Sequence, residues 1–380
     1  MCMRTARRQS CAALLCLLLA IAAGPVGCAG DHSGETTVPE RIVFLGDSIT
    51  DGFTYPLLVR QALAEAGLPA PTVINAGIGG DTAAGMAARL DRDVLVHRPD
   101  LVTLSVGIND VLRDVPLDAY EAKVRAILER LRDEGVPVLV MTTSVLGEKK
   151  REEDEALADY NAVLRRLAEA FGLDVAEVYT VMDRARQGGL EVIEVDHVHP
   201  NYAGHRQMAR AVLDALGHPD VPVPETLVVE TLPGLVSPWR IRAATKDEPA
   251  LTAGTVAAVR PDDTWAELRL PETEPLESWW SDQVRRRGFA LSLQDLAGPA
   301  KRYLARAVVT SPEERTVYLN TGGHLQTAWL NGQQVFAADG WTGYHAGKER
   351  LPVTLQKGEN VLVLETGAQW FLSLTETNDW

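Results

Sequence analysis

Between residues 40 and 218, short apolar runs alternate with longer amphipathic segments, and this alternation restricts the fold more than any other feature of the chain. The runs are rich in valine, isoleucine and leucine without strict alternation, as expected of strands that are covered on both faces. They are "RIVFLG" (41–46), "TVINAG" (72–77), "DLVTLSVG" (100–107), "VPVLVMTT" (136–143) and "LDVAEV" (173–178). Strands that alternate with helices predict a parallel sheet with helices on both sides.

The segments between these runs have the spacing of helices. Their apolar residues recur at three and four positions, and each segment ends at a glycine that suits a helix C-cap. They are "YPLLVRQALAEAG" (55–67), "LDAYEAKVRAILERLRDEG" (117–135) and "EDEALADYNAVLRRLAEAFG" (153–172). We therefore predict an α/β domain over residues 40–218.

Helical periodicity mostly disappears after the proline-rich join "DVPVPETL" (220–227), and all eight tryptophans follow it. Short alternating strands take over, with turn signals at "NG" (331–332) and "KGEN" (357–360). The strands are "YLARAVV" (303–309), "RTVYLN" (315–320), "LQTAWLNGQQVF" (325–336), "LPVTL" (351–355) and "NVLVLE" (360–365). This pattern predicts a second, all-β sandwich domain over residues 219–380.

Residues 1–28 have the pattern of a signal peptide and are left out of the fold. Three arginines precede the uninterrupted apolar run Cys11–Ala23, which is too short to span a bilayer comfortably as a permanent helix. All four cysteines, at positions 2, 11, 16 and 28, lie in this segment. Disulfides therefore cannot hold the mature protein together.

The residues "PVGC" (25–28) resemble a bacterial lipobox, although Pro25 stands where leucine is usual. The resemblance implies that Cys28 becomes the lipidated first residue after cleavage. The polar residues 29–39 would then form a short tether. We expect an exported protein that is anchored to a membrane through lipidated Cys28; a periplasmic or secreted protein and an uncleaved anchor are the alternatives.

The composition is that of a globular protein with a strongly acidic balance. A formal net charge of −15 and a pI near 5.0 argue against a nucleic-acid partner, which would require a basic face to neutralise phosphates. The acidity selects no substrate and is explained by solubility alone.

In a parallel α/β sheet, ligands gather at the carboxyl ends of the strands. Polar groups follow three predicted strands, and a fourth polar segment comes just before a helix that Pro200 can start. The four segments are "GDSIT" (46–50), "NAGIGGDT" (75–82), "VGIND" (106–110) and "DHVHPNYAGH" (196–205).

Together these segments supply what acyl transfer requires. Serine is a weak nucleophile until a base takes its proton, and His199 could be that base for Ser48. Asp196, three residues before His199, can reach the imidazole Nδ1 and fix its tautomer. The backbone N–H groups of Ser48 and Gly80 and the amide of Asn109 could hold the oxyanion. Glycine at position 80 lets the backbone approach closely.

The blocks "GDSIT", "NAGIGGDT", "GIND" and "DHVHP" resemble, in this order, the conserved blocks of the SGNH (GDSL-type) hydrolases. The resemblance covers about residues 40–218. It implies a flavodoxin-like three-layer α/β/α fold, the SGNH hydrolase fold, that hydrolyses esters with no metal and no cofactor. It implies the same roles for Ser48, Gly80, Asn109, Asp196 and His199. Thr50 stands at the second glycine of G-x-S-x-G, which separates the chain from ordinary lipases.

Several nearby residues have simpler interpretations. Asp47 and Gly79 suit the turns in which they stand. His197 is not explained by the family blocks and is interpreted as a pocket-wall or surface histidine. A metal site made of Asp196, His197, His199 and His205 is disfavoured, because no second ligand cluster supports it.

Two further segments have no catalytic role in this interpretation. "GIGGDT" (77–82) lacks the lysine of a phosphate-binding loop. The charge run "GEKKREEDEAL" (147–157) is interpreted as a solvated helix start, with a lid over the site as the alternative.

The second domain loosely resembles the galactose-binding-like β-sandwiches that are appended to many glycan-active enzymes. The cues are "YLARAVV", "AWLNGQQVF" and "LQKGENVLVLETGAQWFLSL". For Trp341 and Trp370 the core is the favoured place and contact with a sugar the alternative, because tryptophan serves both.

We therefore predict an exported serine esterase that acts through an acyl-Ser48 intermediate, with acetyl esters on carbohydrate as the first choice of substrate. A lysophospholipase or thioesterase is the alternative within the same chemistry. A non-catalytic, glycan-binding surface lipoprotein is the alternative from another class. The oligomeric state is left open.

Overall fold

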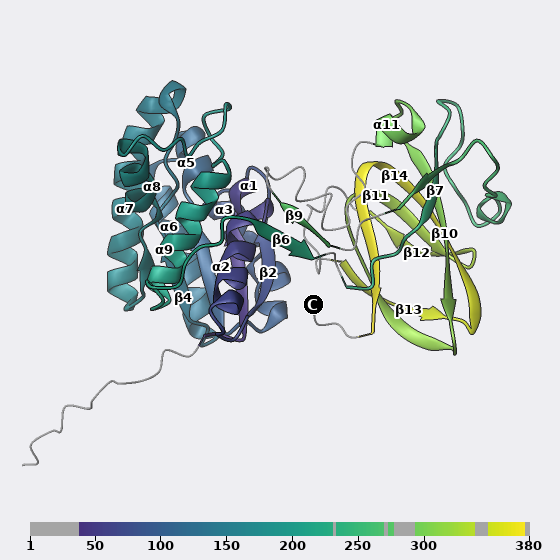
Figure 1. Cartoon of the computed structure of the whole chain (residues 1–380), viewed down its shortest axis with the longest axis horizontal. Helices are drawn as coiled ribbons and strands as arrows, with labels where there is room; N and C mark the ends of the chain where they lie inside the picture. The colour runs from purple at the N-terminus through teal and green to yellow at the C-terminus, as the bar shows by residue number, and fades with distance from the viewer. Residues whose placement is uncertain (1–37, 231–232, 270–272, 277–292, 339–348, 377–380) are drawn as a thin grey trace, which may run out of the picture. The chain divides into compact units, whose positions relative to one another are not determined.

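The computed structural model describes residues 38–230, 233–269, 273–276, 293–338 and 349–376 (Figure 1). The predicted signal peptide with Cys28, most of the tether, and Trp341 lie outside these residues. Within them, no helix combines the length and apolar character that crossing a membrane would require.

A parallel sheet of five strands forms the centre of the first part of the chain, in the order β2-β1-β3-β4-β5. The strands are β1 (Arg41–Gly46), β2 (Thr72–Gly77), β3 (Leu101–Ser105), β4 (Val138–Met141) and β5 (Val175–Ala176). This order is that of a flavodoxin-like, doubly wound sheet, so the predicted fold is confirmed. Gly46 is paired with Gly77, so β1 and β2 end at the same level of the sheet.

The helices divide into two packed groups. In one group α9 contacts both α2 and α8; in the other α6 contacts α3 and α7, and α7 contacts α5. They cover the sheet as outer layers, which makes three layers in all (Figure 1). The helices are α1 (Ser48–Asp51), α2 (Thr54–Glu65), α3 (Ala83–Ala88), α4 (Leu90–Asp93), α5 (Ile108–Leu112), α6 (Leu117–Asp133), α7 (Arg151–Phe171), α8 (Val178–Gln187) and α9 (Tyr202–Ala215). Short 3-10 turns cover Leu95–His97 and Glu148–Lys150.

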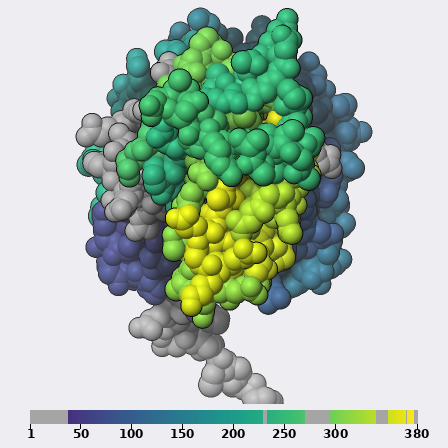
Figure 2. Space-filling model, turned by 90° about the vertical axis from the view of Figure 1, so that its right-hand side faces the viewer, coloured from purple at the N-terminus to yellow at the C-terminus, as the bar shows by residue number. Residues whose placement is uncertain are grey.

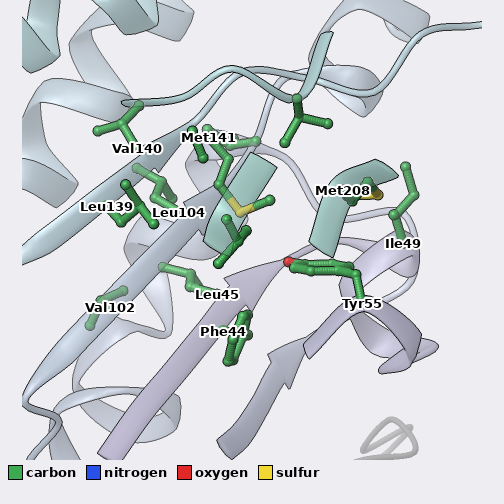
Figure 3. Packing of buried hydrophobic residues seen from close by; sticks show 14 of the residues in the cluster. Phe44, Leu45, Ile49, Tyr55, Val102, Leu104, Leu139, Val140, Met141 and Met208 are labelled. Carbon is green, nitrogen blue, oxygen red and sulfur yellow. The ribbon is translucent and has the colours of Figure 1, made fainter. Parts of the chain in front are cut away.

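The core of this part explains why β1 shows no polar alternation. Its residues Ile42, Val43, Phe44 and Leu45 are all fully buried, because helices cover both faces of the strand. Phe44 meets Tyr55 of α2 edge-on, with ring centroids 5.6 Å apart (Figure 3). The tight packing fixes the level at which β1 ends.

The second part of the chain is mainly β, with an antiparallel sheet in the strand order β12-β11-β14-β10-β7-β8 and β13 also paired to β11. Its strands are β7 (Trp239–Ala243), β8 (Ala266–Leu268), β10 (Tyr303–Ser311), β11 (Arg315–Leu330), β12 (Gln333–Ala337), β13 (Glu349–Leu355) and β14 (Gly358–Thr375). A two-stranded ribbon joins β6 (Leu227–Glu230) to β9 (Thr273–Leu276). Two short helical segments are Val256–Ala258 and α11 (Leu293–Ala297). Figure 2 looks onto this part, with residues 233–269 in green above the yellow strands β13 and β14.

Two of these strands are longer than the sequence pattern indicates. The predicted strands 315–320 and 325–336 are not separated as expected, because residues 315–330 form the single strand β11 and β12 starts after the turn at 331–332. The pairing between β11 and β14 shifts register beside Gly323. The early half of β11 pairs with β13 and the late half with β12.

Trp370 lies in the core of the β part. Its ring is fully buried and meets Trp239 edge-on, with centroids 4.9 Å apart. The core interpretation of Trp370 is therefore confirmed, and its side chain is not available for stacking on a sugar.

Candidate active site

Ser48 lies where β1 turns into α1. Asp47 caps this helix, and its Oδ1 accepts the N–H of Ile49 at 3.0 Å. A Cβ at Gly46 would lie 2.0 Å from Thr50 Oγ1, so the strand can turn this tightly only at a glycine. The local sequence therefore places the hydroxyl of Ser48 at the carboxyl edge of the sheet.

His199 and Asp196 meet Ser48 across a long stretch of chain. Ser48 Oγ lies 2.8 Å from His199 Nε2, and Asp196 Oδ2 lies 2.6 Å from His199 Nδ1. A carboxylate only accepts hydrogen bonds, so Nδ1 carries the proton and Nε2 is left to accept the hydroxyl proton of Ser48. This is the tautomer that a general base next to serine requires.

Asp196 is held as a carboxylate by its own loop. Its Oδ1 accepts the N–H groups of Val198 at 2.9 Å and of His199 at 3.0 Å. Partial burial raises the pKa of Asp196, but these N–H groups and the His199 imidazole outweigh it and leave the pKa below its ordinary value. The negative charge that would stabilise an imidazolium is therefore present even in mild acid.

The predicted oxyanion donors lie on loops that are tied to one another. Asn109 stands in α5, and its Nδ2 donates to Asp47 Oδ2 at 3.1 Å. A side-chain amide has two hydrogens, so one remains for a ligand. Arg113 at the end of the same helix donates from Nη2 to the carbonyl of Gly80 at 2.6 Å. Gly80 has a φ of +75°, a conformation that disfavours a side chain.

The backbone N–H groups of Ser48 and Gly80 have no acceptor among the residues that the structure describes. They are free to bind an anion, as an oxyanion hole requires. Gly79 precedes Gly80 in the same turn, and a Cβ there would meet Asp51 only at 4.0 Å. The space around Gly79 is open, which is consistent with its interpretation as a turn residue.

Asp47 does more than hold a turn. It is 2% exposed, and burial raises its pKa from 3.8 to about 6, although the Ile49 N–H opposes the shift. Its second oxygen fixes the rotamer of Asn109. This link joins the β1 and β3 ends of the sheet, so Asp47 is a positioning residue for an oxyanion donor.

Sequence reasoning missed two supporting residues, Arg89 and Asp110. Arg89 donates to the carbonyl of Gly46 at 2.9 Å and to Asp81 at 2.7 Å, which ties the loop after β2 to the end of β1. Asp110 accepts the N–H of Ala83 at 3.2 Å, and burial raises its pKa to about 6. Only the position of Asp110 beside Asn109 offered a signal, since an arginine in a helical segment is ordinary.

The two extra histidines occupy different surroundings. His205 is buried and stacks on Tyr55 with ring centroids 6.3 Å apart. Burial, and secondarily the charge of His199, lowers the pKa of His205 from 6.5 to about 3, so it is a neutral core residue. His197, in the turn that carries the Asp196–His199 dyad, lines a cavity of about 790 Å³, as its pocket-wall interpretation predicted. Across the described parts of the chain, no group of three or more His, Cys, Asp or Glu side chains is arranged to hold a metal ion.

The charge run 147–157 forms the Glu148–Lys150 turn and the start of α7. Glu148, Arg151 and Glu155 from this run line the same cavity as His197. The run is therefore a solvated helix start, as favoured, and it also forms part of a cavity wall.

Comparison with known proteins places these blocks in context. Residues 44–207 match the GDSL-like Lipase/Acylhydrolase family, and all five predicted site residues lie inside the matched segment. An acetylxylan esterase of Geobacillus stearothermophilus is 29% identical over 216 residues, which cover 47% of this chain and 94% of that protein. An arylesterase of Vibrio mimicus is 34% identical over 30% of this chain and 59% of its own length. The thioesterase 1/protease 1/lysophospholipase L1 of Escherichia coli strain K12 is 26% identical over 43% of this chain and 76% of its own length.

Proposed function

We propose that this carboxylic ester hydrolase, which carries a GDSL-like lipase/acylhydrolase domain over residues 44–207, removes acetyl groups from carbohydrate with Ser48 as its nucleophile. The hydrogen-bonded chain from Ser48 through His199 to Asp196 is the observation that carries the proposal.

The reaction begins as Ser48 Oγ attacks the ester carbonyl carbon and its proton passes to His199 Nε2. The carbonyl oxygen becomes an oxyanion, which the N–H groups of Ser48 and Gly80 and the amide of Asn109 stabilise. Asp196 stabilises the imidazolium that forms.

The carbon–oxygen bond to the alcohol then breaks, and His199 Nε2 gives its proton to the departing oxygen. Water attacks the acyl-Ser48 carbonyl in the second half of the reaction, again with His199 as the base. Breakdown of this second intermediate returns the proton to Ser48 and releases the acid.

Acetylated carbohydrate is the proposed substrate for two reasons. The acetylxylan esterase relative aligns along 94% of its own length. The all-β part of the chain would suit a galactose-binding-like accessory domain, although Trp370 is not its sugar contact. A lysophospholipase or thioesterase is the second candidate, supported by the Escherichia coli relative.

Export and anchoring through Cys28 form part of the proposal, supported by the leader of residues 1–28. A Cys28→Ala variant expressed in a bacterial host should move from the membrane fraction to the soluble exported fraction. Equal membrane retention of variant and wild type would contradict lipidation.

The decisive experiment measures acetate released from acetylated xylan, together with the rates on p-nitrophenyl acetate and p-nitrophenyl octanoate. We expect acetate release, a rate that falls steeply from acetyl to octanoyl, and loss of both activities in Ser48→Ala. A faster rate on octanoyl would favour the lipid candidate. Equal background rates for wild type and Ser48→Ala on every ester would favour the non-catalytic alternative.

A further inference from the structure

A cavity of about 790 Å³ is lined in part by Val195 and His197, from the turn that carries the Asp196–His199 dyad. The connection after β4, the end of α8 and the loop of residues 189–197 form its walls. Its volume lies within the range of sites that enclose small ligands. His197 lines it, and His199, two residues later, faces Ser48.

The loop that carries the dyad also forms one wall of the cavity. The N–H of His197 donates to the carbonyl of Glu194, and the N–H of Glu194 donates to the carbonyl of His199 at 2.8 Å. A ligand bound against this wall would therefore contact the same hydrogen-bonded turn that carries the general base His199.

His197 adopts a backbone conformation that needs a reason. Its φ is +64°, which is uncommon for a residue other than glycine, although histidine adopts it more often than most side chains. A Cβ at Gly147 would lie 2.6 Å from His197 Nδ1, so the ring is packed closely against the opposite wall. The N–H of Gly147 donates to the carbonyl of His197 at 3.0 Å, which joins the two walls.

The floor of the cavity is a satisfied polar network. Asp154 accepts the N–H of Leu146 at 2.7 Å, and its other oxygen pairs with Arg186 at 3.1 Å. Tyr179 O–H donates to the same carboxylate at 3.3 Å. Arg186 is therefore already neutralised and does not offer a free positive charge to a ligand.

The rim combines exposed apolar side chains with carboxylates. Val195, directly before Asp196, is 89% exposed, and Leu190 is 43% exposed. Glu148, Glu191 and Glu194 line the cavity and have no ion pair among the described residues, whereas the cation Arg151 in the same lining is paired with Glu155 at 3.2 Å. Carboxylates accept hydrogen bonds from hydroxyl groups and repel anions, while apolar side chains pack on C–H faces.

The reaction itself decides which half of the ester lies here. His199 must protonate the oxygen of the departing alcohol, so the alcohol lies on the histidine side of Ser48. The oxyanion donors come instead from the ends of β1, β2 and β3. Val195 and His197, which flank Asp196 in the same turn as His199, line the cavity, and we therefore infer that it lies on the histidine side of Ser48.

We propose that this cavity binds the alcohol half of the ester as a neutral sugar chain, with His197 and Val195 as specificity-determining residues. The inference rests on the proposed function and deepens it. Uncharged sugars fit its mixture of apolar rim and hydrogen-bond acceptors, whereas the phosphate groups of a lipid or a coenzyme would meet unpaired carboxylates.

The test compares kcat/KM for a neutral acetylated xylo-oligosaccharide with kcat/KM for p-nitrophenyl acetate. Val195→Asp should lower the ratio of the two at least tenfold, mainly through a higher KM for the oligosaccharide. His197→Asn should lower it similarly, since asparagine tolerates a positive φ. Val96→Asp is the matched control, because Val96 is a 52% exposed valine that does not line the cavity.

Ratios unchanged in both variants would overturn the inference, as would a parallel fall on both esters, which would mean that the turn only positions the dyad. A KM increase confined to p-nitrophenyl octanoate or a lysophospholipid would replace the sugar by a lipid. Failure of wild type to release acetate from any sugar would instead count against the proposed function.

Discussion

The two sides of Ser48 are constructed differently. On the oxyanion side, Asp47 is 2% exposed and its hydrogen bonds join the ends of two strands. On the base side, Asp196 is 43% and His199 25% exposed, and the contacts that hold them come from within one short turn. Donors to an oxyanion stabilise it most when they cannot reorganise. The base must instead reach water and the departing alcohol, so an open turn suits it.

The largest effect should follow removal of the base side. His199→Ala should lower kcat by about 10⁴ to 10⁶ with little change in KM, because groups that act as a unit lose most of their effect together. Steady-state kinetics on p-nitrophenyl acetate measures this. The double variant Ser48→Ala/His199→Ala should be no slower than either single variant, and additive losses would contradict a shared mechanism.

Removing an oxyanion donor should lower kcat less than removing the base, and it should affect only the stability of the transition state. Asn109→Ala should lower kcat about 10² to 10³-fold while KM stays nearly constant. Asn201→Ala is a useful control for general damage, since its side chain caps α9 and bonds the carbonyl of Glu191. If Asn109→Ala changed only KM, its amide would contact ground-state substrate instead.

Asp47→Asn should separate activity from stability. The native Asp47 carboxyl holds its proton up to about pH 6, whereas an unfolded chain releases it near pH 3.8, so the native state loses stability as pH rises through this window. A shift of this size corresponds to about 3 kcal/mol. Relative to wild type, the variant should therefore gain about 2 to 3 kcal/mol in free energy of unfolding between pH 4 and pH 7.

Urea unfolding at the two pH values measures this gain. Asp110 also has a raised pKa, but it is present in both proteins, so its effect on stability cancels in the difference. The same variant should lose about tenfold in kcat, because Asn109 loses its charged acceptor. A stability difference that does not change with pH would mean that Asp47 is ionised throughout.

The smallest effect concerns the core beneath the base side. The pKa of His205 is about 3 in the folded protein and an ordinary 6.5 in the unfolded chain. The stability that the neutral His205 contributes is therefore complete above pH 6.5 and is lost as the pH falls towards 3. Between pH 7.5 and 5.5, His205→Phe should lose about 1 kcal/mol less stability than wild type. Thermal or urea unfolding can detect this, and parallel pH profiles would refute a neutral buried histidine.

Much of the site could be predicted from the sequence because the ends of parallel strands meet at one edge of a sheet. Ser48 follows β1 and Asn109 follows β3, and both are where that rule places them. The spacing of Asp196 and His199 predicts their contact, since three residues allow a turn to bring the carboxylate to the ring. That this turn meets Ser48 is predicted from the needs of acyl transfer and from the resemblance to the family blocks.

The supporting contacts could not be predicted in this way. Asp47 and Asn109 are 62 positions apart, and either residue has a sufficient local explanation as a cap. The cavity walls come from residues near 150 and near 192, which no periodicity connects. The positive φ of His197 is a property of the packed turn and has no signature in residue type.

In the β part, residues 315–330 form one strand although the sequence pattern predicts a break near Gly322 and Gly323. Glycine is often a strand breaker, so the pattern predicts two short strands there. Strong pairing on both sides of β11 carries the strand through, and the glycines instead allow the register shift.

The place of β14 in its sheet has a consequence for biosynthesis. It lies between β11 and β10 but follows both in sequence, whereas the strands of the α/β part are complete by residue 176. When the chain is exported as proposed and emerges on the far side of the membrane, the edges of β10 and β11 would lack their partner until β14 follows, and they would remain open to wrong pairing. The β part, and not the earlier α/β part with Ser48, is therefore where assistance from a folding chaperone would matter most.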